Sequence, residues 1–177
     1  VPGIIAGTFD IAAPSISDAT LLAIKDANSN KDLVGDTLTT YLVDYRGYGY
    51  IGINANLVNV GGDPASEASK NLRKGIMTVL SVYRETVINS YYGDRASVIQ
   101  YPISNTSWAA PQPTDVGYQI AYSRDVNGNP IYDASMNDEQ KYEAALQAAV
   151  GFFQAAGYTW DGSKFTAAPE GAKMVYE

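Results

Sequence analysis

The chain has 177 residues, enough for one domain with its own hydrophobic core, and its 46% of hydrophobic residues argues against disorder. It has 12 Lys and Arg against 19 Asp and Glu, and the resulting net charge of −7 disfavours binding to nucleic acid or to anionic membranes. It contains no histidine and no cysteine, which excludes the commonest general base, a thiolate nucleophile and the usual zinc ligands.

The N-terminal segment predicts a short helix followed by a short strand. Pro2 suits the first turn of a helix, and Gly7 can end that helix in the left-handed conformation. Residues 8–13 then read as a strand that Pro14 stops, because proline cannot donate a ladder hydrogen bond. Ser17 follows as the cap of a second helix, since its hydroxyl can accept an amide hydrogen of the first turn.

This second helix is predicted to bury Leu21, Leu22 and Ile24, and to end in the polar turn at residues 28–30. The segments beyond it are rich in β-branched and aromatic residues, which favour strands. Two strands and a glycine-rich loop are therefore expected next, at residues 37–43, 48–54 and 61–64.

The clearest periodicity in the chain predicts a central helix over about residues 70–92. Large apolar residues recur at the spacing that lines one helix face, namely at Leu72, Ile76, Val79, Leu80, Tyr83 and Val87. Ser66 or Ser69 can cap its first turn, and Gly93 can close its last turn. Gly75 lies inside this helix at a cost of about 1 kcal/mol relative to alanine, which indicates that another backbone comes close there.

A long irregular region rich in proline, serine and threonine follows the central helix, at residues 101–113. Loops of this length in compact domains are usually functional or mobile. Residues 125–130 predict a turn with Asn127 and Gly128 at its tip.

A last helix is predicted to begin at Asn137, with Gln140 in the capping-box position, and to end at Gly157. Its buried side is expected to consist of Tyr142, Leu146, Ala149, Val150 and Phe153. Residues 174–176 predict the beginning of a final strand.

Residues 46–53, from Arg46 to Ile53, imitate the strand motif with which RNA-recognition domains stack exposed aromatic residues on bases. The final aromatic of that motif is replaced by Ile53. The acidic net charge and the absence of a basic stripe argue against RNA as a partner. An RNA-binding domain is therefore the alternative hypothesis, and a strand with closely packed glycines is the simpler interpretation.

The acidic residues suggest two further alternatives. Asp125, Asn127 and Asn129 alternate as in calcium loops, but no glutamate lies at the required later position, which favours a hairpin turn and no metal site. A fragment of a carboxylate-based glycosidase stays open as an alternative. No two acids have apolar surroundings that would raise the pKa of one of them, so we assign no catalytic residue.

Several segments resemble, in order and spacing, the oligopeptide- and dipeptide-binding class of extracellular solute-binding proteins of ABC importers. These segments are GTFDIA, GYGYIGINA, SKNLRKGIMTVLSVYRETVI, YYGDRASVIQYPISNTSW and EAALQAAVGFFQAAGYTWDG. In that family a strand ending in Asn leads through a loop to a helix with an Arg and a terminal Arg-acid pair, and a later helix ends in Ala-Gly-Tyr. The matching residues here are Asn54, Arg73, Arg84, Glu85, Ala156, Gly157 and Tyr158. Ala68 and Ser69 replace the usual Asn-Asp, a departure that keeps a capping residue.

The resemblance implies an α/β fold with helices packed on a mixed sheet, in which residues 1–177 form a single α/β domain. This domain would be part of the C-terminal lobe of a larger protein with two lobes of the periplasmic-binding-protein type. The apolar beginning and end of the chain also lead us to expect a piece of a longer protein.

The function implied by the resemblance is non-enzymatic and needs no cofactor. The two lobes would close around an extracellular solute, most simply an oligopeptide or dipeptide, and deliver it to ABC permease subunits. The expected partners are thus the solute, the missing first lobe and the permease, without nucleic acid, and the expected location is extracellular or periplasmic with a lipoprotein anchor. The loop residues directed at the ligand cleft would be Asp63, Pro64, Tyr101, Asn105, Thr106 and Trp108.

Overall fold

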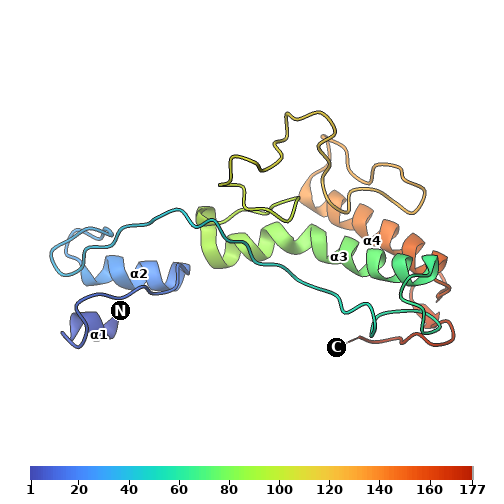
Figure 1. Ribbon diagram of the computed structural model, residues 1–177, viewed down its shortest axis with the longest axis horizontal. Coiled ribbons are helices and arrows are strands. Elements are labelled where there is room, and N and C mark those ends of the chain that lie inside the picture. The colour runs from blue at the N-terminus through green and yellow to red at the C-terminus, as the bar shows by residue number, and fades with distance from the viewer. Residues whose placement is uncertain (177) are drawn as a thin grey trace. The chain divides into compact units, whose positions relative to one another are not determined.

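The computed structural model describes residues 1–176, which contain three main helices and one small sheet (Figure 1). The helices are α2 (Asp18–Ala27), α3 (Glu67–Tyr92) and α4 (Asp138–Ala155), with a short α1 (Pro2–Ile5) and a 3-10 turn, η1 (Gly93–Arg95). Strands β1 (Thr159–Trp160) and β2 (Phe165–Ala167) pair antiparallel as a two-stranded sheet. Helices with a small sheet agree with the predicted α/β class. The predicted mixed sheet is wrong, because the described residues contain this antiparallel pair alone.

The described residues divide into two compact units. Unit 1 comprises Val1–Gly47, Glu85–Ile99 and Ile103–Ala110. Unit 2 comprises Tyr48–Arg84, Gln100–Pro102 and the chain from Pro111 to the last described residue. Helix α3 contributes its first part to unit 2 and its last part to unit 1. No helix among the described residues is both long and apolar enough to cross a membrane.

The four segments predicted as strands outside this sheet, residues 8–13, 37–43, 48–54 and 174–176, are irregular. A strand is stable only when its backbone groups pair with a neighbouring strand, whatever its propensity. Among the described residues, the only pairing near these segments is an isolated bridge between Val34 and Thr39. The predictions were wrong because the composition favours an extended chain but does not supply a partner strand.

Unit 1 has a small core built on α2. The Ser17 hydroxyl accepts a hydrogen bond from the Thr20 amide, as predicted for the cap. Leu21 and Ile24 are buried together with Leu38, whereas Leu22 lies on the exposed side of the helix and not in the predicted core. The helix ends at Ala27, and the amide N–H of the following residue, Asn28, donates to the Lys25 carbonyl.

Helix α3 begins three residues earlier than predicted and ends at the predicted residue, followed by Gly93 with φ of 62°. Leu72 is fully buried, but Tyr83 and Val87 are exposed, so the predicted apolar stripe is buried only in its first part. Val87 lies outside both hydrophobic clusters of the described residues.

Unit 2 is held together by the packing of α3 against α4. The predicted capping box is present, with the Asn137 and Gln140 side chains each bonded to the backbone of the other. Gly75 allows a close approach, because a Cβ there would lie 3.2 Å from the Phe153 ring and 3.3 Å from the Cβ of Phe152. These are side-chain atoms of α4, so the predicted close neighbour is a helix face and not a bare backbone.

The core of unit 2 joins α3, the end of α4 and the hairpin. Leu72, Ala156 and Tyr158 form a buried cluster, and the rings of Phe153 and Phe165 pack against it. Of the residues predicted for the buried side of α4, Ala149 is fully buried, whereas Tyr142, Leu146, Val150 and Phe153 are half-buried. Gly157 ends the region with φ of 97°, a conformation that favours glycine.

Candidate functional site

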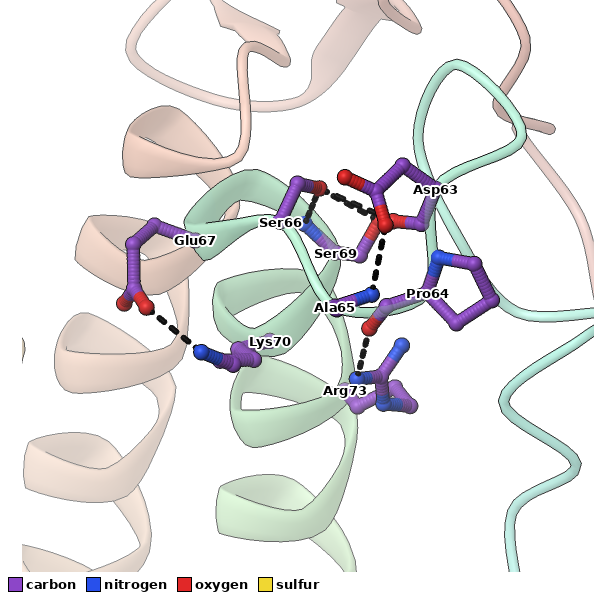
Figure 2. A network of polar contacts seen from close by, with 8 residues as sticks. All are labelled: Asp63, Pro64, Ala65, Ser66, Glu67, Ser69, Lys70 and Arg73. Atoms are coloured by element: carbon purple, nitrogen blue, oxygen red, sulfur yellow. Dashed lines mark hydrogen bonds and ion pairs between the residues drawn. The ribbon is translucent and has the colours of Figure 1, made fainter.

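The loop that leads into α3 is organised around the buried hydroxyl of Ser69. This hydroxyl accepts a hydrogen bond from the Val60 amide at 2.8 Å and donates one to the Asp63 carbonyl at 2.6 Å. The Ser66 side chain caps the helix by accepting from the Ser69 amide at 3.2 Å (Figure 2). Gly61 and Gly62, with φ of 64° and 76°, let the chain turn tightly before the helix. The loop is therefore a fixed structure.

Arg73 ties the same loop to the preceding turn. Its guanidinium group donates to the Pro64 carbonyl at 2.7 Å, visible in Figure 2, and to the Val58 carbonyl at 3.0 Å. The turn itself starts at Asn54, whose carbonyl accepts from the amides of Leu57 and Val58. Arginine can hold two carbonyls at once because its donors lie in a rigid planar fork. Two residues that carry the family resemblance, Asn54 and Arg73, thus build the approach to α3.

Replacing Ser69 by alanine should lower the free energy of unfolding of unit 2 by about 1–3 kcal/mol, because the Val60 amide and the Asp63 carbonyl lose a buried partner. Urea unfolding followed by the fluorescence of Trp160, whose ring contacts that of Phe165 in unit 2, measures this loss. Ser123→Ala is the matched control in the same unit, since the Ser123 hydroxyl makes an exposed hydrogen bond to the nearby Ile120 carbonyl. Equal stability of the two variants would contradict the role assigned to Ser69.

A cavity of about 360 Å³ lies beside the first turns of α3. The helix contributes three cationic side chains and one apolar one, at Lys70, Arg73, Lys74 and Met77. Their i, i+3, i+4 and i+7 spacing places them on one helix face, and Leu72 lies on the opposite, buried face. We call this set the cationic face of α3.

The remaining walls of this cavity are apolar or aromatic. Ile51 and Ile53 come from the irregular segment before the loop, and Tyr122 comes from the turn before the 125–130 hairpin. Tyr122 has φ of 57°, a left-handed conformation that non-glycine residues rarely adopt. Such strained residues cluster at functional sites. The cavity thus combines apolar walls with positive charge in a chain whose net charge is −7.

Lys70 and Lys74 differ in their hydrogen-bond and ion-pair partners. The Lys70 ammonium donates to the Glu67 carboxylate at 2.7 Å (Figure 2). This hydrogen bond, and then the charges of Lys70 and Lys74, lower the pKa of the Glu67 carboxyl, so Glu67 is ionised at neutral pH. Within the described part of the chain, the Lys74 ammonium has neither a hydrogen-bond acceptor nor an ion-pair partner.

Two of the predicted ligand-binding residues, Asp63 and Pro64, help to form the loop before α3. The Asp63 carboxylate accepts from the Ala65 amide at 2.9 Å, and the Pro64 carbonyl is bound by Arg73. Tyr101, also in unit 2, accepts a hydrogen bond at its hydroxyl from the Gln119 amide, and its ring contacts Tyr118. Tyr101 therefore holds the segment after the central helix in place.

The other three predicted residues belong to unit 1. The Asn105 side chain donates to the Ser97 hydroxyl at 2.6 Å, and the Thr106 hydroxyl bonds that of Ser104. Trp108 is 98% exposed, so its ring is not part of a hydrophobic core among the described residues. Exposing a whole indole ring to water is unfavourable, so burying this ring under a ligand or another protein would favour binding.

The alternatives from the sequence find little support in the geometry. Residues 46–53 form no strand, so the described residues lack the aromatic sheet that the RNA motif requires.

The Asp125 carboxylate accepts from the amides of Asn127 and Asn129, which confirms the predicted hairpin turn. The carboxyls with a resolved shift all have a lowered pKa, opposite to that of a glycosidase acid, namely Asp36, Glu67, Asp125, Asp133 and Asp161. No acidic cluster among residues 1–176 could hold a metal ion.

Comparisons with protein-family models, with curated proteins and with solved structures find no match to this chain.

The cationic face was missed in the sequence, although its signal is present there. Three of the 12 Lys and Arg of the chain lie at i, i+3 and i+4 in this helix. Charges at this spacing normally indicate a solvated helix face. The walls could not be predicted, because Ile51, Ile53 and Tyr122 reach the helix through irregular segments.

Proposed function

We propose that this chain is part of one lobe of an extracellular solute-binding protein that delivers a small solute, most simply a peptide, to an ABC importer. In this proposal the intact protein has two lobes of the periplasmic-binding-protein type and closes them around the solute. The permease subunits and the first lobe are its partners, and a lipid anchor holds it outside the cytoplasmic membrane.

The observation that carries the proposal is that residues of the family resemblance hold unit 2 together. Arg73 binds the carbonyls of Val58 and Pro64, and Tyr158 lies in the core with its hydroxyl donating to the Lys173 carbonyl at 2.6 Å. Gly157 supplies the left-handed turn between α4 and β1. Residues that a family shares for such structural reasons are expected to keep their geometry while the ligand contacts vary.

Irregular segments within each unit also suit ligand binding. They are irregular and expose aromatic rings, at Tyr41, Tyr45, Tyr50 and Trp108. Binding residues are often found on loops that a rigid scaffold positions, and aromatic side chains dominate the energetics of binding sites. Exposed rings on irregular segments thus fit a protein that closes on its ligand.

We expect Trp108→Ala to weaken solute binding by the longer protein by about 1–3 kcal/mol, because an exposed indole acts as an aromatic anchor when a ligand covers it. In the 177-residue chain the same change should alter the free energy of unfolding by less than about 0.5 kcal/mol, since the ring has no core contacts to lose. Calorimetric titration of the longer protein with a peptide library, and a melting curve of each variant, measure the two effects.

Tyr50→Ala is the matched control for this experiment, because Tyr50 is also an exposed aromatic residue but belongs to unit 2. Its effect separates a specific role of Trp108 from a general effect of removing a surface ring. Loss of stability without loss of binding in Trp108→Ala would refute the anchor role.

A further inference from the structure

We propose that the cavity beside the cationic face of α3 binds a small organic anion, a carboxylate with an apolar body. This site lies entirely within unit 2 and needs no second lobe, so it goes beyond the function proposed above. Its volume of about 360 Å³ lies in the range of small-molecule sites.

The charge of the site selects an anion. Lys70, Arg73 and Lys74 all line the cavity, whereas no acidic residue does. The Arg73 guanidinium is already bonded to two carbonyls, and Lys70 is paired with Glu67, so Lys74 is the cation free to meet a ligand. An ammonium group with no acceptor in the protein forms a charge-assisted hydrogen bond with a carboxylate at little reorganisation cost.

The walls select a ligand with an apolar body. Ile51, Ile53 and Met77 line the cavity with aliphatic and thioether surface, and Tyr122 adds an aromatic ring. Ile51 is exposed, so an apolar ligand that covers it removes apolar surface from water, which favours binding. Methionine adapts its shape to different ligands because its side chain is flexible and polarisable. An inorganic anion would use the charge of the site but none of these walls.

Glu67 is placed to oppose such a ligand. Its ionised carboxylate pairs with the Lys70 ammonium and so competes with an incoming carboxylate for the same donor. Removing this charge would leave Lys70 available as a second donor. The site therefore makes a two-sided prediction, in which loss of a cation weakens binding and loss of Glu67 strengthens it.

The test is a titration of the 177-residue chain with 3-phenylpropionate, using 3-phenylpropanol as the neutral ligand of similar shape. The chain contains three methionines, and 13C-labelled methyl groups report on each of them by NMR. We expect the Met77 signal to shift on titration while the signals of Met136 and Met174 stay in place. A dissociation constant of about 1 mM is expected for a ligand of this size, with weaker binding of the alcohol.

Variants then identify which charged side chains contribute to binding of the carboxylate. Lys74→Gln should weaken binding of 3-phenylpropionate by about three- to tenfold, and Lys74→Arg should restore most of it. Glu67→Gln should strengthen binding by about two- to fivefold. Lys141→Gln is the matched control, because Lys141 lies on α4 outside the cavity and changes the net charge equally.

Three results would overturn the proposal. The first is equal binding of the acid and the alcohol, and the second is an equal loss in Lys74→Gln and Lys141→Gln. The third is a titration in which the Met77 signal does not move at several millimolar acid. None of these results would bear on the two-lobe proposal, which is tested with peptides and the longer protein.

Discussion

Replacing Leu72 by alanine should lower the free energy of unfolding of unit 2 by about 2–5 kcal/mol, the largest effect expected in this chain. Leu72 is 0% exposed and lies at the centre of the cluster that joins α3 to Ala156 and Tyr158. The change removes apolar contacts and leaves a cavity that the two helices and the hairpin cannot close completely. Urea unfolding followed by Trp160 fluorescence measures the loss, because Trp160 lies in this unit.

Leu57→Ala is the matched control for this prediction. It makes the same chemical change in the same unit at a side chain that is 67% exposed, so it should cost less than about 0.5 kcal/mol. A small effect of Leu72→Ala, equal to that of the control, would mean that α3 does not pack on the end of α4.

Replacing Asn28 by alanine should destabilise unit 1 by about 2–4 kcal/mol. The side chain is 1% exposed and makes four hydrogen bonds to the backbone of the loop after α2. It donates to the carbonyls of Asp32 and Leu38, and it accepts from the amides of Thr37 and Leu38 at 3.1 and 2.7 Å. Alanine would leave these backbone groups without partners in a partly buried position.

Amide hydrogen exchange at Thr37 and Leu38 measures this effect directly, because their N–H groups bond to Asn28. We expect their exchange to accelerate by at least about tenfold, since each 1.4 kcal/mol of lost protection is a factor of ten. Asn30→Ala is the control, because the exposed Asn30 side chain makes only two hydrogen bonds, donating to the Val34 carbonyl and accepting from the Asp32 amide. Unchanged exchange in Asn28→Ala would show that the loop holds its shape without this side chain.

The helices could be predicted from the sequence because the residues that start and end a helix lie next to it in the chain. Ser17, Asn137 and Gln140 cap neighbouring amides, and Gly93 and Gly157 supply left-handed residues after the helices, so short segments contain the whole signal. The predicted strands were wrong for the opposite reason. Their stability depends on a partner strand, and neither residues 37–43 nor residues 48–54 have one among the described residues.

Burial was harder to predict than secondary structure. Leu21 and Leu22 are neighbours of one type, and the first is a core residue because Leu38 and other distant apolar residues pack against one side of α2. Asn28 was predicted as part of a polar turn, but it is the buried centre of its loop, because its four bonds reach residues up to ten positions away.

The candidate site was predictable only in part. The loop at Asp63 and Pro64 was expected from its glycines and proline, and the structure places it at the start of α3. The hydrogen bond from Arg73 to the Pro64 carbonyl depends on where α3 begins relative to the loop. Local sequence patterns predict that position poorly. The cavity depends on Tyr122, whose backbone conformation no pattern around it indicates.

The central claim, that this chain is part of a two-lobe solute-binding protein, is tested most directly by calorimetric titration of a peptide library into the longer protein and into the 177-residue chain. A solute held between two lobes loses most of its contacts when one lobe is absent, and each 1.4 kcal/mol of lost contact is about tenfold in affinity. The longer protein should bind a peptide with a dissociation constant of about 1 μM or tighter, and the chain alone at least about 100-fold more weakly. Tight peptide binding by the 177-residue chain alone, or none by the longer protein, would contradict the two-lobe account.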